Sequence, residues 1–139
     1  WDGMPVWGKL RYFSELFKEN ASAVVASTYC NSWVFDFDLD DPLLSMARAY
    51  TGIFINRSEE VKEKVLAGLI DEYQIDGVIY HDSKTCPHNS NNRFGLPQRL
   101  QQETKVPYLV VDGDLNDLRC FSQEQTTTSL EAFVEQLSE

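Results

Sequence analysis

Two apolar stretches decide the fold, Asp76-Gly77-Val78-Ile79-Tyr80 (DGVIY) and Val106-Pro107-Tyr108-Leu109-Val110-Val111 (VPYLVV). Both are rich in the β-branched and aromatic residues that strands favour, and neither alternates as a half-exposed strand would. Between them we expect a helix over residues 95–104, with Pro97 in its first turn. A strand, a helix and a second doubly buried strand predict a right-handed crossover in a parallel sheet.

The segment before DGVIY contains the clearest helix pattern. Asn56, three residues before Glu59, makes a capping-box pattern, and Ser58 is a competing cap. Asp76-Gly77 ends this helix. Its apolar stripe consists of Val61, Val65, Leu69 and Tyr73, flanked by Leu66 and Ile70.

The remaining segments continue the alternation of helix and strand. Residues 6–19 predict a helix, and residues 21–29 (ASAVVASTY) predict a doubly buried strand. Residues 30–41 predict a long aromatic and acidic loop or edge region, after which Pro42 opens a short helix. Ser122 with Gln125 makes a capping box for the last helix.

These elements predict one α/β, Rossmann-like domain over residues 1–139, with a parallel sheet of about four strands in the order 2-1-3-4. The first strand, in the middle, ends at the turn 3–5. Ligands bind such sheets where the strand order reverses, here between that turn and the loop 82–93. Because the chain opens at Trp1 in what resembles a strand end, we expect the carboxyl-terminal part of a larger subunit.

Charge and cysteine content exclude several classes of function. Twelve basic residues face 22 acidic ones, and the net charge of -10 disfavours nucleic acid and anionic membranes as partners. No apolar run approaches the roughly 20 residues that cross a bilayer. The three cysteines, Cys30, Cys86 and Cys120, form neither a disulfide framework nor a zinc pattern, so we expect reduced thiols in the cytoplasm.

Cys86 is the main candidate for chemistry because it follows a strand end in a polar loop. Lys84, His88 and Arg93 supply nearby positive charge, which suits a metal or cluster ligand or a reactive thiol. The alternative is an inert, half-buried cysteine. We interpret Cys30 as a packing residue and Cys120 as a structural residue.

Two further groups have both a metal-binding and a plain interpretation. His81 and His88 with Cys86 offer zinc ligands, but at spacings that no standard motif uses. Three carboxylates after the last predicted strand (Asp112, Asp114 and Asp117) suit Mg²⁺ or the capping of turns equally well. The acidic residues of the 36–41 segment are interpreted as a solvated loop. No nucleotide-binding motif is present.

Four segments in order resemble the carboxyl-terminal domain of the 2-hydroxyacyl-CoA dehydratase and benzoyl-CoA reductase family. The residues that carry the resemblance are GMPVW (3–7), DGVIYHDSKTC (76–86), VPYLVVDGDLNDLR (106–119) and the last helix from Ser122 to Glu135. The resemblance implies a subunit with two Rossmann-like halves that pairs with a second, related subunit.

The resemblance also implies a cofactor and a reaction. It implies a [4Fe-4S] cluster held through three cysteines, the last of them at Cys86, with Lys84 steadying the cluster charge. An ATP-dependent activator protein supplies one electron, and a ketyl radical of a 2-hydroxyacyl-CoA then loses its hydroxyl; in the reductases an aromatic ring is reduced instead. Cys30 and Cys120 do not match ligand positions, so the fragment alone is expected to hold an incomplete cluster and to be inactive.

Three alternatives stay open from the sequence. Within the family, the chain suits a benzoyl-CoA reductase-type subunit or a double-cubane cluster protein. Outside it, a non-catalytic Rossmann-like domain would bind or assemble a partner subunit through the aromatic, acidic segment 30–41.

Overall fold

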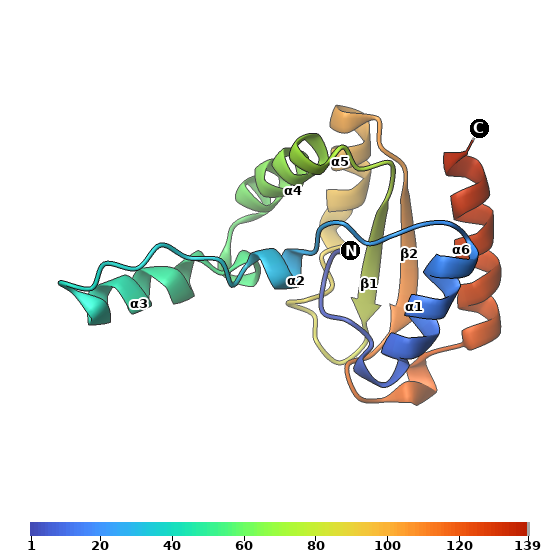
Figure 1. Ribbon diagram of the computed structural model, residues 1–139, viewed down its shortest axis with the longest axis horizontal. Coiled ribbons are helices and arrows are strands. Elements are labelled where there is room, and N and C mark those ends of the chain that lie inside the picture. The colour runs from blue at the N-terminus through green and yellow to red at the C-terminus, as the bar shows by residue number, and fades with distance from the viewer. Residues whose placement is uncertain (139) are drawn as a thin grey trace.

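The computed structural model describes residues 1–138 as a parallel sheet between two layers of helices (Figure 1). β1 (Val78–Ser83) and β2 (Tyr108–Gly113) pair along their whole length, from Val78 opposite Tyr108 to Ser83 opposite Gly113. α5 (Leu96–Thr104) is the helix of the crossover between them. The predicted strand–helix–strand unit with a parallel sheet is therefore confirmed.

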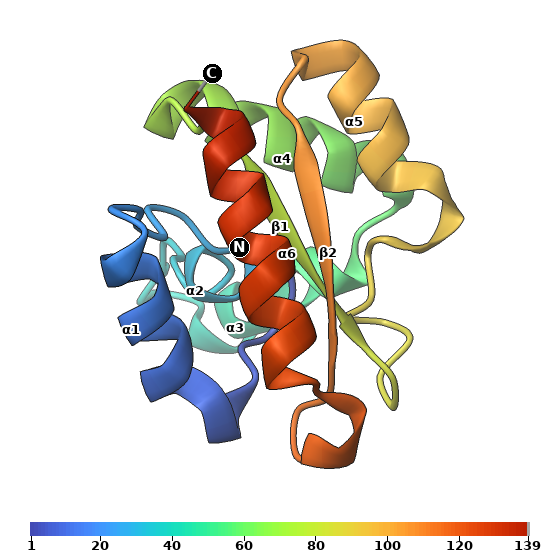
Figure 2. The same cartoon turned by 90° about the vertical axis from the view of Figure 1, so that its right-hand side faces the viewer.

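Helices cover both faces of the sheet. α4 (Glu59–Tyr73) and α5 lie on one face, and α1 (Leu10–Glu19) and α6 (Gln123–Leu137) lie on the other (Figure 2). Because side chains alternate between the faces of a strand, each face builds its own core. One core contains Val6, Phe13, Leu16, Ile79, Val111, Leu130 and Phe133, and the other contains Phe54, Leu66, Ile70, Val78, Tyr80, Leu96 and Leu100.

Residues 1–138 contain two strands rather than the four expected, and the order 2-1-3-4 is not confirmed. The predicted strand 21–29 is irregular chain that runs into a short helix, α2 (Thr28–Asn31). Two backbone hydrogen bonds, of 2.9 and 3.1 Å, join it to Trp1, and two more, of 2.8 and 3.1 Å, join Asp2 to β1. Gly3, with a φ of +86°, then turns the chain away, so neither pairing extends into a ladder.

Side-chain caps mark the start of two helices whose first residues the sequence predicts. The Asp41 side chain accepts a hydrogen bond from Leu44 N at the start of α3 (Pro42–Gly52), and Ser122 accepts one from Gln125 N at the start of α6. Ser58 stands at the N-cap of α4 without a side-chain bond. Residues 1–138 also contain four 3₁₀ turns: η1 (Trp7–Lys9), η2 (Phe54–Asn56), η3 (Arg93–Gly95) and η4 (Leu118–Cys120).

α4 presents two apolar faces instead of one. Leu66 and Ile70 are buried against the sheet side. Val61, Val65 and Tyr73, which belong to the stripe seen in the sequence, are exposed. The residues with the clearest helical spacing thus lie outside the core.

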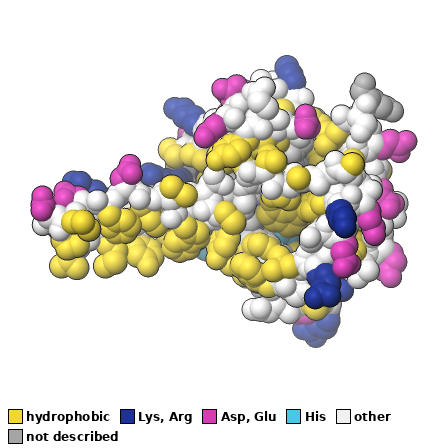
Figure 3. Space-filling view, viewed as in Figure 1, with side chains coloured by type: hydrophobic (Ala, Val, Ile, Leu, Met, Phe, Trp, Pro, Cys, Tyr) yellow, Lys and Arg dark blue, Asp and Glu magenta, His cyan; other side chains and the backbone are white. Residues whose placement is uncertain are grey.

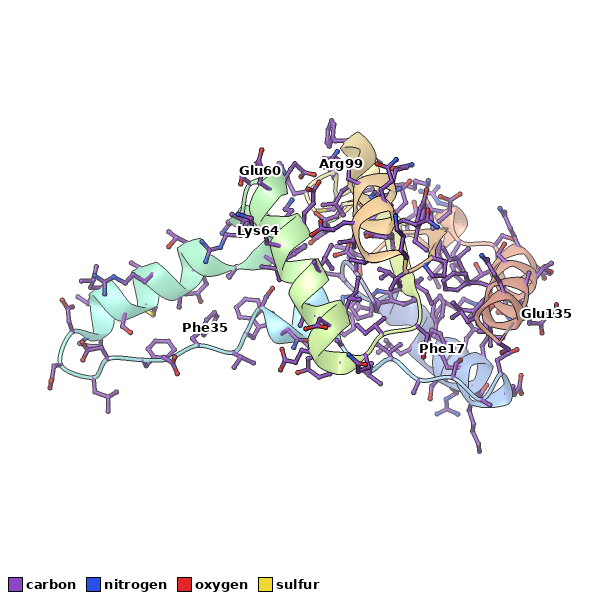
Figure 4. The ribbon with its side chains drawn as sticks, turned by 90° about the horizontal axis from the view of Figure 1, so that it is seen from above. Phe17, Phe35, Glu60, Lys64, Arg99 and Glu135 are labelled. Atoms are coloured by element: carbon purple, nitrogen blue, oxygen red, sulfur yellow. The ribbon has the colours of Figure 1, made fainter. Side chains whose placement is uncertain are left out.

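Residues 33–52, which we call the arm, project away from the sheet (Figure 1). The extended segment 33–41 leads outward, and α3 leads back toward the body. Seen from above, Phe35 lies in the arm, far from Phe17 and Glu135 on the opposite side of the molecule (Figure 4). None of the helices in residues 1–138 combines the length and apolarity that crossing a bilayer requires.

Candidate functional site

The carboxyl ends of β1 and β2 carry a charge-neutral cluster. Asp82 and Asp112 are register partners, and Lys84 Nζ lies 2.6 Å from a carboxylate oxygen of each. Arg93 lies 3.3 Å from the other oxygen of Asp82. Partial burial would raise the pKa of Asp82, but hydrogen bonds and charge from Lys84 and Arg93 lower it. The same bonds, chiefly the one to Asp112, raise the pKa of the Lys84 ammonium. Lys84 therefore lies at the carboxyl ends of β1 and β2, which we call the sheet mouth, and carboxylates balance its charge.

Cys86 lies at the start of the loop that leaves β1. Its side chain is half-buried, and Sγ accepts a hydrogen bond from the side-chain amide of Asn89 across 3.3 Å. Ser90 Oγ bonds to the backbone carbonyls of Ser83 at 2.7 Å and Cys86 at 3.1 Å. These bonds fold the loop into a compact turn that holds the thiol at the sheet mouth and outside the two apolar cores.

Asp114 joins this loop to the end of β2. Its buried carboxylate accepts hydrogen bonds from the backbone N–H and the hydroxyl of Thr85, at 2.9 and 2.5 Å. It also accepts hydrogen bonds from the backbone N–H groups of Asn116 and Asp117, both at 3.2 Å. The hydroxyl bond from Thr85 is the main cause that holds the pKa of Asp114 well below its usual range. The turn-capping interpretation of Asp114 is confirmed.

A second buried carboxylate, that of Asp2, joins the first turn to the same loop. Asp2 Oδ1 accepts hydrogen bonds from Thr28 Oγ1 at 2.9 Å and from Asn91 Nδ2 at 3.3 Å. Burial raises the pKa of Asp2, although both bonds oppose this. At Gly3, a Cβ would lie 3.0 Å from the carbonyl oxygen of Asn89, so glycine allows the turn to touch the loop. The first turn, α2 and the Cys86 loop are thus fastened together.

The other candidates from the sequence lie elsewhere. Cys30 is exposed on α2, which contradicts its expected packing role, and Cys120 is half-buried in η4. His88 is exposed, whereas His81 is buried with Nδ1 2.6 Å from the carbonyl oxygen of Met4. Burial lowers the pKa of His81.

The His, Cys, Asp and Glu side chains are the residues that could bind a metal ion. Within residues 1–138, no group of three or more His, Cys, Asp or Glu side chains is placed to hold a metal ion. A zinc site built from both histidines and Cys86 therefore has no geometric support. The half-buried thiol of Cys86 fits one ligand position of an iron–sulfur cluster, because a thiolate is the usual ligand and this one is reachable.

Sequence reasoning does not single out three residues that shape this site: Asp2, Asn89 and Asn91. Aspartate beside a glycine turn and asparagine in a polar loop are typical of solvated turns. Their burial is visible only once the fold brings the first turn and the loop together. A polar loop that follows a doubly buried strand is the one signal that points toward them.

The chain matches the family model described as 2-hydroxyglutaryl-CoA dehydratase, D-component, over residues 1–137. It is 33% identical to the alpha subunit of lactoyl-CoA dehydratase from Anaerotignum propionicum over 99% of this chain and 33% of that protein. It is 27% identical to a benzoyl-CoA reductase polypeptide of Thauera aromatica, again over 99% of this chain and 33% of the relative. The chain spans about a third of the length of these relatives. It belongs to the family of 2-hydroxyacyl-CoA dehydratase and benzoyl-CoA reductase subunits.

Proposed function

We propose that this chain is a domain of a 2-hydroxyacyl-CoA dehydratase subunit and that Cys86 supplies one ligand to a [4Fe-4S] cluster. The observation that carries the proposal is the half-buried Cys86 thiol in the loop that follows β1, bonded to Asn89, whose carbonyl oxygen lies against Gly3 of the first turn. The remaining ligands would come from outside residues 1–138. Such a chain would act in the cytoplasm with a second, related subunit and an ATP-dependent activator protein.

The residues of the loop would each have a defined task. The bound cluster would supply the low-potential electron that a 2-hydroxyacyl-CoA thioester needs before its hydroxyl can leave. Cys86 would bind iron through Sγ, with Asn89 fixing the direction of that sulfur. Lys84 would steady the cluster charge only in part, because Asp82 and Asp112 already bond to its ammonium. The similarity to a benzoyl-CoA reductase polypeptide keeps aromatic-ring reduction as the alternative chemistry; a double-cubane cluster protein is another alternative.

An assembly role is the second candidate, and the exposed apolar arm favours it. In that case the domain would hold a partner subunit without contributing to chemistry. Both roles are compatible in one subunit, but only the first requires iron at Cys86.

The decisive experiment replaces Cys86 in the full-length subunit, produced with its partner in the absence of oxygen. Cys86→Ser is expected to lower the iron content and to abolish dehydratase activity, because a hydroxyl is a poor cluster ligand. Cys30→Ser and Cys120→Ser are matched controls that should keep both. Unchanged iron content and activity in Cys86→Ser would refute the proposal.

A further inference from the structure

The arm and the outer face of α4 enclose a groove of about 750 Å³. Val61, Val65 and Leu69 line its wall on α4, and Phe35 and Phe37 line its wall on the arm. The wall on α4 is therefore apolar, and the wall on the arm combines the two aromatic rings with the carboxylates of Asp36 and Asp38. The second apolar face of α4 is explained if another apolar segment lies in this groove.

The arm exposes more apolar surface than isolated surface residues would. Val34 is 80% exposed, Leu39 is 85% exposed and Leu43 is 75% exposed. In Figure 3, hydrophobic side chains form a continuous band along the lower edge of the arm and reach the body. A contiguous band of this kind marks an interaction surface.

The charge of the arm selects the kind of partner. Asp36 and Asp38 line the groove, and Asp40 and Asp41 lie directly before α3. Residues 33–47 contain no Lys or Arg, and no ion pair to these four carboxylates is found within residues 1–138. Arg48 and Arg57 line the groove and offset part of this charge. A second copy of this chain, with its own net charge of -10, would add acidic groups to an acidic arm.

We propose that the groove and the arm are the seat of the paired subunit, which inserts an apolar segment bordered by Lys or Arg. This inference rests on the proposed pairing with a second subunit, and it assigns the surface that makes the contact. The apolar segment would cover the exposed leucines of the arm and the outer valines of α4. The basic border would meet the four aspartates.

The test measures the affinity of the full-length subunit for its partner. A double variant, Leu39→Ser with Leu43→Ser, is expected to weaken binding by at least about tenfold, because two exposed leucines lose their cover in the complex. Leu10→Ser on α1, where the leucine is 47% exposed, is the matched control and should change the affinity by less than about threefold. In a second double variant, Asp36→Asn with Asp40→Asn, the affinity for the partner should depend less on the salt concentration than it does in the wild type.

Three results would overturn the proposal. The first is unchanged partner affinity in both double variants. The second concerns the full-length subunit without its partner: if the leucine double variant, but neither of the other variants, unfolds at a lower temperature than the wild type, the subunit covers the arm with its own chain. The third is a wild-type subunit that dimerises by itself through the arm. Iron content in Cys86→Ser is measured separately, so a failure of the cluster proposal is distinguishable from a failure of this one.

Discussion

The side-chain amide of Asn89 donates a hydrogen bond to Cys86 Sγ across 3.3 Å, from three residues further along the same turn. Hydrogen bonds to ligand sulfurs stabilise the more negative, reduced state of a cluster and raise its reduction potential. If Cys86 is a ligand, Asn89→Leu in the full-length complex is expected to shift the midpoint potential to a more negative value. A redox titration followed by electron paramagnetic resonance measures this shift.

The matched control for this prediction lies in the same loop. Asn92 is half-buried, and its Oδ1 has no hydrogen-bond partner within residues 1–138, so Asn92→Leu makes the same change without touching the sulfur. Its midpoint potential should equal that of the wild type. An identical potential in both variants would show that the Asn89 bond does not act on the cluster.

Asp114 is expected to be the main polar stabiliser of the loop. Asp114→Ala removes the acceptor of four hydrogen bonds and should lower the free energy of unfolding by about 2 kcal/mol. Asp112→Ala removes one exposed ion pair and should cost less than about 1 kcal/mol. Urea unfolding of both variants checks the difference, and equal losses would contradict it.

The pH dependence of stability follows from the same carboxylate. Because the pKa of Asp114 is lowered on folding, its contribution is complete above the ordinary value of 3.8 and is lost as the pH falls toward the folded pKa. Stability of the wild type should therefore decrease on acidification below about pH 5, and more steeply than that of Asp114→Ala. Parallel curves would exclude Asp114 as the source.

The sequence predicted the parts of the fold that depend on local pattern and on burial from both faces. Val78–Tyr80 and Tyr108–Val111 lie in the paired strands, and Ser122 caps α6 through local geometry. β1 is buried on both faces as expected, whereas the expectation of double burial is wrong for β2, in which Val110 is 37% exposed. Residues 21–29 have the composition of a strand, but their pairing with the start of the chain stops at two hydrogen bonds to Trp1, because Gly3 turns the chain away. The sequence predicts that Cys86 follows a strand end. Its hydrogen bond to Asn89 is not predictable in this way, because it depends on how the turn closes.

Asp2 should destabilise the protein through its charge. Asp2→Asn keeps an acceptor for Thr28 and Asn91, and its amide nitrogen replaces Oδ2, which already lacks a partner within residues 1–138. Since burial raises the pKa of Asp2, wild-type stability from this group is present below the ordinary value of 3.8 and is lost as the pH rises through the folded pKa. Asp2→Asn is therefore expected to raise the free energy of unfolding by about 1 kcal/mol near pH 7, and this gain should vanish in acid. Urea unfolding at both pH values measures this, and a gain that does not depend on pH would refute it.

Two glycines outside the site test how closely α6 packs on the entry to β1. A Cβ at Gly77 would lie 2.7 Å from Phe133 Cζ and 2.9 Å from Leu137 Cδ1, so the ring and the leucine must both move. Gly77→Ala is expected to lower the free energy of unfolding by about 1–3 kcal/mol, the usual cost of overpacking. Gly68 on α4 has no atom within 4 Å of its added Cβ, and there alanine should stabilise the helix by about 1 kcal/mol. Thermal unfolding of the two variants should move in opposite directions; a stabilised Gly77→Ala would mean that α6 lies farther from the strand than the structure places it.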